Sequence, residues 1–193
     1  TEVRVVYDDE ALYVGAWLFD SDPSSLVFGQ TLRDASLNES DAFVLVLDTY
    51  LDRQNAFVFG TTPAGIEYDG QVTSEGQGSG RFGGGGRPGN TRQQGGSGGG
   101  FNLNWDGAWQ VRTAISDIGW SAEFAIPFRT IRYPARETQS WGVNFQRNIR
   151  HRNEESYWAP LPRQFNLYRL SLAGEMQGVE VPVQRNLKLT PYV

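Results

Sequence analysis

The chain has 193 residues, of which 39% are hydrophobic and 13% aromatic, and this composition suits a single domain with its own core. Its formal net charge of -5 is unlike the basic footprint of nucleic-acid-binding proteins, so we expect no nucleic-acid partner. The absence of cysteine excludes disulfides, a thiolate nucleophile and cysteine-bound zinc, and the absence of any apolar run near ~18 residues indicates no transmembrane segment.

A two-residue alternation of side chains recurs along the chain and predicts β-strands. Segments with this period span residues 12–19, 43–48, 109–115, 120–126 and 141–145. Residues that favour turns separate the strands, at positions 8–10, 20–23, 62–65 and 117–119. Apolar residues at helical spacing do not persist, and we expect short helical turns only near residues 127–131 and 160–165.

Many short strands separated by regular turns are typical of a β-sandwich or a barrel. Several strands carry large residues on both faces, which indicates either burial on both sides or a ligand-binding face. The alternation places the following residues in the predicted core: Val14, Trp17 or an alternate on its strand, Phe43, Leu45, Val111, Trp120, Phe124 and Trp141.

Residues 76–100 differ from the rest of the chain. Glycine makes up 13 of these 25 residues, acidic residues are absent, and the only charges are Arg81, Arg87 and Arg92. Such a segment cannot bury enough apolar surface to offset its ordering entropy, so we predict a flexible insert between two strands. The G-x-G-x-x-G pattern at residues 78–83 follows from glycine density, because no strand-to-helix junction surrounds it.

The single histidine offers little catalytic chemistry. His151 lies between Arg150 and Arg152, whose guanidinium groups disfavour an imidazolium, and the chain has no second histidine as a co-ligand. We therefore interpret His151 as a surface or interface residue.

Acidic residues suggest two further kinds of site. Glycosidases use a pair of carboxylates, for which the strand residues Glu67, Asp69 and Glu123 are candidates. Calcium prefers oxygen ligands, which two pairs of turn residues provide: Asp20 with Asp22, and Asp48 with Asp52. Solvent-facing strand positions and turn formation explain these residues more simply. We predict no catalytic residue, no metal site and no cofactor, and hence a protein that is not an enzyme.

Aromatic residues in polar segments are the candidate ligand contacts, because tryptophan stacks on sugar rings or anchors protein interfaces. Trp105 follows the insert, and Tyr157 and Trp158 lie in residues 153–160. For Trp105 and Trp158, ligand contact and core packing remain equally open. Three other tryptophans alternate in phase with apolar neighbours and are predicted to pack in the core: Trp109, Trp120 and Trp141.

An ordered series of short motifs runs along the chain, at residues 1–15, 46–53, 57–65, 119–128, 141–150, 153–158 and 186–192. They include VLDTYLDR, FVFGTTPAG, GWSAEFAIPF and WGVNFQRNIR. This series resembles the family 9 carbohydrate-binding modules, and more closely the sub-group that precedes a bacterial outer-membrane β-barrel region. Residues 186–192 resemble the passage into that region.

The resemblance implies an immunoglobulin-like or jelly-roll sandwich, a periplasmic or cell-surface location, and sugar binding between two tryptophans, sometimes with calcium. Together with the strand pattern, it predicts an all-β fold over residues 1–193, a two-sheet antiparallel β-sandwich with very little helix.

Two functional classes follow from these observations. The first is a structural or adaptor subunit that docks on a protein partner of a membrane-associated assembly. The insert would be its docking arm, with Phe82 as an apolar anchor and Arg81, Arg87 and Arg92 facing carboxylates or carbonyls. The alternative is a module that recognises a glycan through exposed tryptophans. Both place the protein on the periplasmic or cell-surface side of a bacterial envelope.

Overall fold

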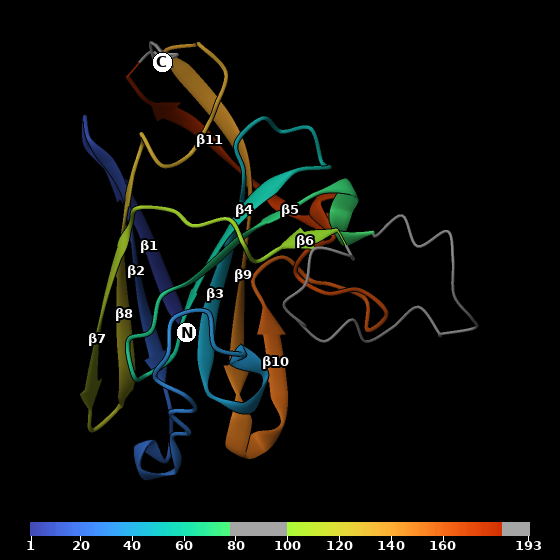
Figure 1. Cartoon of the computed structure of the whole chain (residues 1–193). Helices are drawn as coiled ribbons and strands as arrows, with labels where there is room; N and C mark the ends of the chain where they lie inside the picture. The colour runs from blue at the N-terminus through green and yellow to red at the C-terminus, as the bar shows by residue number, and fades with distance from the viewer. Residues whose placement is uncertain (78–99, 183–193) are drawn as a thin grey trace, which may run out of the picture.

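Two antiparallel β-sheets form two layers in the computed structural model, which describes residues 1–77 and 100–182 (Figure 1). The described residues also contain five 3-10 helices of three residues each. This architecture confirms the predicted all-β sandwich with very little helix. Within the described ranges, no helix has the length and apolar character needed to cross a membrane.

The first sheet has four strands in the order β1-β2-β8-β7. Their bounds are Glu2–Tyr7 for β1, Ala11–Phe19 for β2, Gly119–Pro127 for β8 and Gln110–Ser116 for β7. Every neighbouring pair is antiparallel, and Val14 of β2 lies opposite both Val5 of β1 and Phe124 of β8. Alternate residues of β2 therefore face the second sheet or face outward.

The second sheet has seven strands, in the order β10-β9-β3-β4-β5-β6 with β11 also paired to β9. Their bounds are Ala42–Asp48 (β3), Ala56–Thr61 (β4), Tyr68–Val72 (β5), Phe101–Asn102 (β6), Thr138–Ile149 (β9), Glu154–Tyr157 (β10) and Gly174–Glu180 (β11). The twelve-residue β9 pairs with β11 along its first half and with β10 at its end.

The main core lies between the two sheets and is rich in aromatic rings. Phe124 of the first sheet stacks on Trp109 at 5.6 Å between ring centroids and meets Phe43 of the second sheet at 5.9 Å. Most of the predicted core is confirmed, because the following residues are buried: Val14, Phe43, Leu45, Trp120, Phe124 and Trp141. Val111 is only partly buried, at the edge of this core.

The prediction for residues 12–19 is confirmed through the alternates of Trp17. Leu12, Val14, Ala16 and Leu18 point into the core, whereas Trp17 is 46% exposed on the opposite face of β2. The period of two in a strand makes this division unavoidable once Val14 is buried.

A second apolar cluster covers the other face of the second sheet. Val44, Val46 and Val58 pack there against residues that include Leu37 and Leu170, each the first residue of a 3-10 helix. All residues of β3 and β4 are consequently buried, so burial on both sides is confirmed for these strands. Among the described residues, no comparable cluster covers the outer face of the first sheet.

The two segments expected to form short helical turns, residues 127–131 and 160–165, each form a single hydrogen-bonded turn. The Thr130 N–H donates to the Pro127 carbonyl at 2.9 Å, and the Phe165 N–H donates to the Pro162 carbonyl at the same distance. Each segment closes one such bond and then continues as a loop.

Candidate functional site

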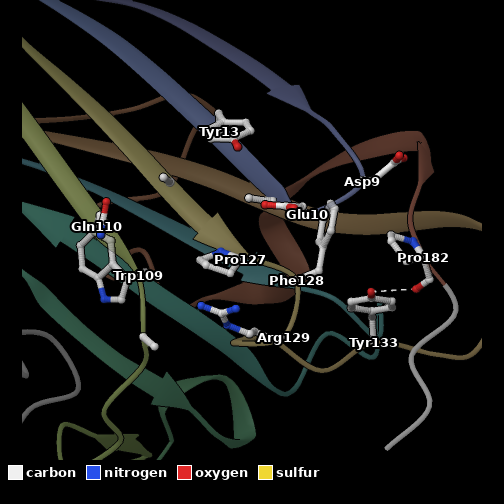
Figure 2. A pocket seen from close by; sticks show the side chains of 13 residues that line it. Asp9, Glu10, Tyr13, Trp109, Gln110, Pro127, Phe128, Arg129, Tyr133 and Pro182 are labelled. Atoms are coloured by element: carbon white, nitrogen blue, oxygen red, sulfur yellow. Dashed lines mark hydrogen bonds between the residues drawn. The ribbon is translucent and has the colours of Figure 1, made fainter.

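A cleft of ≈ 740 Å³ opens at the end of the first sheet where the chain turns from β1 to β2 (Figure 2). Its lining residues come from that turn and the start of β2, from the segment that leads into β7, from the end of β8 and from the segments that follow β8 and β11. Concave sites that mix apolar walls with a few polar groups are the usual form of small-molecule binding sites. The cleft is therefore the candidate functional site.

Asp8 holds one wall of the cleft in place. Its Oδ1 accepts hydrogen bonds from the backbone N–H groups of Glu10 at 2.8 Å and Ala11 at 2.9 Å. Its Oδ2 accepts a hydrogen bond from the Tyr13 hydroxyl at 3.0 Å. These bonds lower the pKa of Asp8, with the Glu10 N–H as the largest cause, and the Asp8 acceptor raises the pKa of Tyr13. The turn predicted at residues 8–10 thus fixes the position of a cleft tyrosine.

Aromatic rings form the apolar part of the cleft. Trp109 lines it while its indole stacks on Phe124 in the core. Phe128 and Tyr133 meet edge to face at 6.1 Å, and the Tyr133 hydroxyl donates to the Pro182 carbonyl at 2.9 Å. The Phe128 N–H donates to the Glu10 carbonyl at 2.9 Å, which joins this wall to the β1–β2 turn. Packing and hydrogen bonds therefore pre-form the cleft.

Besides the carboxylate of Asp9, three lining side chains offer free polar groups. Glu10, Gln110 and Arg129 line the cleft and come from three different segments of the chain, as Figure 2 shows. Within residues 1–77 and 100–182, none of these three side chains makes a hydrogen bond or ion pair. Glutamate supplies acceptors, arginine supplies donors, and glutamine supplies both. The cleft can thus bind a ligand that carries several hydroxyl groups.

The predicted ligand residues lie elsewhere. Of the described residues that line the cleft, none is Trp105, Tyr157 or Trp158. Trp105 is half-buried and packs against the main core, with its ring centroid 5.1 Å from that of Phe57 and 6.0 Å from that of Phe59.

Tyr157 and Trp158 lie at the edge of the second sheet. Tyr157 packs against the second apolar cluster, and burial, followed by the nearby charge of Glu155, raises its pKa. Trp158 is 58% exposed and meets Phe145 edge to face at 5.9 Å. A ligand contact of Trp158 stays a prediction, whereas the structure does not bring Trp105 and Trp158 together in one described site.

The predicted docking residues Arg81, Phe82, Arg87 and Arg92 lie outside the residues that the structure describes.

The strand carboxylates considered as a glycosidase pair do not converge on a cleft. Glu67 and Asp69 both bind the guanidinium group of Arg33, and Asp69 accepts a further hydrogen bond from the Gly107 N–H at 2.7 Å. Burial is the main reason that the pKa of Asp69 is raised. Glu123 is exposed on the opposite sheet. Glu67 and Asp69 therefore tie loops together around Arg33.

The aspartate pairs considered for calcium have different surroundings. Asp48 accepts hydrogen bonds from the N–H groups of Asp52 and Arg53 and closes the β3–β4 turn.

Asp20 lies near Asp41 and His151, with potential ligand atoms within 4.8 Å of one another. Two guanidinium groups also face Asp20, from Arg147 at 3.6 Å and Arg152 at 3.7 Å. Their positive charges compensate the negative charge of the Asp20 carboxylate and repel a metal cation at this cluster.

Sequence patterns alone do not single out Glu10, Gln110 and Arg129. The turn signal covers Glu10, and the alternation covers the strand that Gln110 begins, but polar residues at strand ends are common. What distinguishes them is their convergence on one cleft, which depends on the pairing of β2 with β8 and of β8 with β7.

No protein-family model and no curated protein matches the chain. Solved structures do. A family 9 carbohydrate-binding module (CBM9) from Caldicellulosiruptor kristjanssonii in complex with glucose is 17% identical, with a TM-score of 0.50 over 98% of this chain and 79% of that one. A CBM9 structure from the same organism in complex with cellotriose is 16% identical, with a TM-score of 0.49 over 99% of this chain and 79% of that one. These likenesses give no support to the predicted outer-membrane context. The likeness to the glucose complex does identify the architecture: the fold of the chain is a CBM9-like β-sandwich.

Proposed function

We propose that the protein is a non-catalytic carbohydrate-binding module that holds part of a glycan in the cleft beside the β1–β2 turn. The observation that carries this proposal is the convergence of Glu10, Gln110 and Arg129 on a cleft with aromatic walls. A module of similar fold is in complex with glucose, which supports the same class of ligand here.

The chemistry of the cleft suits both the hydroxyl groups and the apolar ring face of a sugar. Each sugar hydroxyl donates and accepts a hydrogen bond, and the cleft offers a carboxylate, an amide and a guanidinium group as partners. Hydrogen bonds to charged groups are about twice as strong as those between neutral groups. The apolar face of a sugar ring can pack on Tyr13 or Phe128.

The positions of the cleft carboxylates favour binding over hydrolysis. Asp9 and Glu10 are consecutive residues of one turn. Glycosidases instead place two carboxyl groups on either side of the scissile bond. The comparisons give no support to the predicted adaptor role, and the periplasmic or cell-surface location stays a prediction.

Titration with a panel of soluble oligosaccharides, followed by isothermal calorimetry, tests the proposal. We expect Arg129→Ala and Glu10→Gln each to weaken binding about tenfold or more, because a hydrogen bond to a charged group contributes roughly 1.5 to 3 kcal/mol. Arg163→Ala and Glu39→Gln are matched controls, since both residues are exposed and neither lines the cleft. They should bind as the unaltered protein does.

Two results contradict this assignment. The first is an absence of binding across the whole panel. The second is binding that Trp158→Ala abolishes while Arg129→Ala and Glu10→Gln leave it unchanged, which would place the site at the edge of the second sheet.

A further inference from the structure

The outer face of the first sheet carries a row of aromatic side chains along β2. Tyr13, Gly15, Trp17 and Phe19 alternate with the buried residues of this strand and therefore share its outward face. Trp17 is 46% and Phe19 45% exposed. Exposed apolar patches of this kind mark interaction sites more often than isolated exposed residues do.

This face is continuous with the cleft. Tyr13 pairs with Ala125 of β8, and Ala125 pairs with Gln110 of β7, so the three residues form one row across the sheet. The same three residues line the cleft. A ligand that fills the cleft can therefore extend past Tyr13 onto the sheet without crossing another structural element among the described residues.

Gly15 leaves an open gap between Tyr13 and Trp17. A Cβ atom at Gly15 would have no described atom within 4 Å. With a rise of about 3.4 Å per residue, Tyr13 and Trp17 lie about 14 Å apart along β2. The surface over Gly15 is thus a shallow depression between two aromatic rings, and it is long enough for more than one sugar ring.

The charges of the outer face balance. Beside Gly15 lie Arg4 on one side and Glu123 on the other, and Glu123 pairs in register with Arg112. Arg4 also forms an ion pair with Glu2 at 2.7 Å. Two arginines and two glutamates give no net charge, so the face has no electrostatic preference for an anionic polymer such as a polyuronide. Their polar groups remain suitable for hydroxyl groups.

We propose that the outer face of the first sheet is a track for an extended, uncharged glycan that leaves the cleft past Tyr13, crosses Gly15 and stacks on Trp17. This inference rests on the proposed function and deepens it, because it names the ligand as a chain of several sugars. The second sheet has no equivalent surface, since loops of the described chain cover its outer side. The first sheet keeps its aromatic residues exposed, as a binding face requires.

The test is the affinity for glucose and for linear β-linked glucose oligomers of increasing length. We expect affinity to rise with length until the oligomer reaches Trp17. Trp17→Ala should remove this rise, about tenfold for the longest oligomer, and leave the affinity for glucose unchanged. Tyr50→Ala is the matched control, because Tyr50 is also an exposed aromatic residue but follows β3 of the other sheet. It should keep the full length dependence.

A second variant tests whether weaker binding of long oligomers comes from a blocked track and not from a loss of folding. Gly15→Val fills the gap, and valine suits an open strand position, so the variant should unfold at an unchanged temperature. It should block long oligomers and spare glucose. An anionic oligomer of similar length should bind no better than the neutral one.

The outcomes distinguish the track from the cleft. If glucose and the longest oligomer bind equally well and Trp17→Ala changes neither, the track is wrong while the proposed function stands. Binding to none of these sugars, glucose included, contradicts both. If Trp17→Ala abolishes self-association in sedimentation experiments and leaves the affinity for every oligomer unchanged, the face is a protein interface and the track is wrong.

Discussion

Single residues in this protein take their properties from neighbours far away in the sequence. Arg33 binds Glu67 and Asp69 at the start of β5 and Asp106 in the segment between β6 and β7. Tyr68 is buried under Phe101, with the two rings stacked at 6.1 Å. Burial raises the pKa of Tyr68 to about 12. None of these environments has a local sequence signal, because each depends on chain segments that meet only in the folded protein.

The pKa of Tyr68 predicts how stability changes at alkaline pH. The folded pKa lies above the unfolded value of about 10, so the stabilising contribution of Tyr68 is complete below pH ~10 and is lost as the pH rises through ~12. This difference between the folded and unfolded pKa of Tyr68 corresponds to roughly 3 kcal/mol in the free energy of unfolding. We expect Tyr68→Phe to flatten the fall in the free energy of unfolding across this pH range, measured by urea denaturation.

The matched control for this experiment is Tyr50→Phe, since Tyr50 is exposed. It should follow the pH profile of the unaltered protein. The two variants are compared by the slope of stability against pH, because loss of the Tyr68 hydroxyl also changes stability at neutral pH. Equal slopes for both variants would contradict the burial of the ionisable group.

At the scale of elements, each strand of the first sheet serves two surfaces. The inward residues of β8, such as Trp120 and Phe124, join the sheets, whereas Ser121 and Glu123 face outward. Phe124 is the central contact, since it stacks on Trp109 and meets Phe43 of the opposite sheet. Large residues on both faces of a strand therefore had two different explanations, burial for β3 and an open face for β2.

Truncation of Phe124 tests this division of β8. Phe124→Ala should lower the free energy of unfolding by about 3 to 5 kcal/mol, because it removes a buried ring and leaves a cavity between the sheets. Ser121→Ala, on the outward face of the same strand, should change it by less than about 0.5 kcal/mol. Chemical denaturation of both variants gives the comparison. Similar values for the two would mean that the assignment of faces is wrong.

At the scale of the whole molecule, the two segments that flank the insert lie next to each other. The Thr73 N–H donates to the Gly100 carbonyl at 2.8 Å. A Cβ atom on Gly100 would lie 2.4 Å from the carbonyl carbon of Gly76, so these segments are in direct contact. β5 and β6 then pair as neighbours, with Val72 opposite Phe101.

Replacement of residues 78–99 by a short glycine linker should therefore leave the sandwich intact. The flanking segments already touch, and a shorter loop has a smaller closure entropy, so the melting temperature should stay the same or rise slightly. Glycan affinity should also be unchanged, because the cleft uses other segments. Thermal denaturation and calorimetric titration measure both. A loss of glycan affinity in a folded variant would assign the insert to the binding site and contradict this prediction.

The sequence by itself determined the class of fold, because alternation with a period of two and regular turns are local properties that survive without tertiary context. It also identified Trp109, Trp120 and Trp141 as core residues, and its motifs resembled the family whose architecture the chain shares.

Tertiary structure alone decided which polar residues form the cleft and which aromatic face stays open. Glu10, Gln110 and Arg129 meet only because β2, β8 and β7 lie side by side, and Trp17 stays exposed because no described loop covers the first sheet. Strand periodicity divides the residues of a strand between its two faces, but the rest of the chain determines what each face meets.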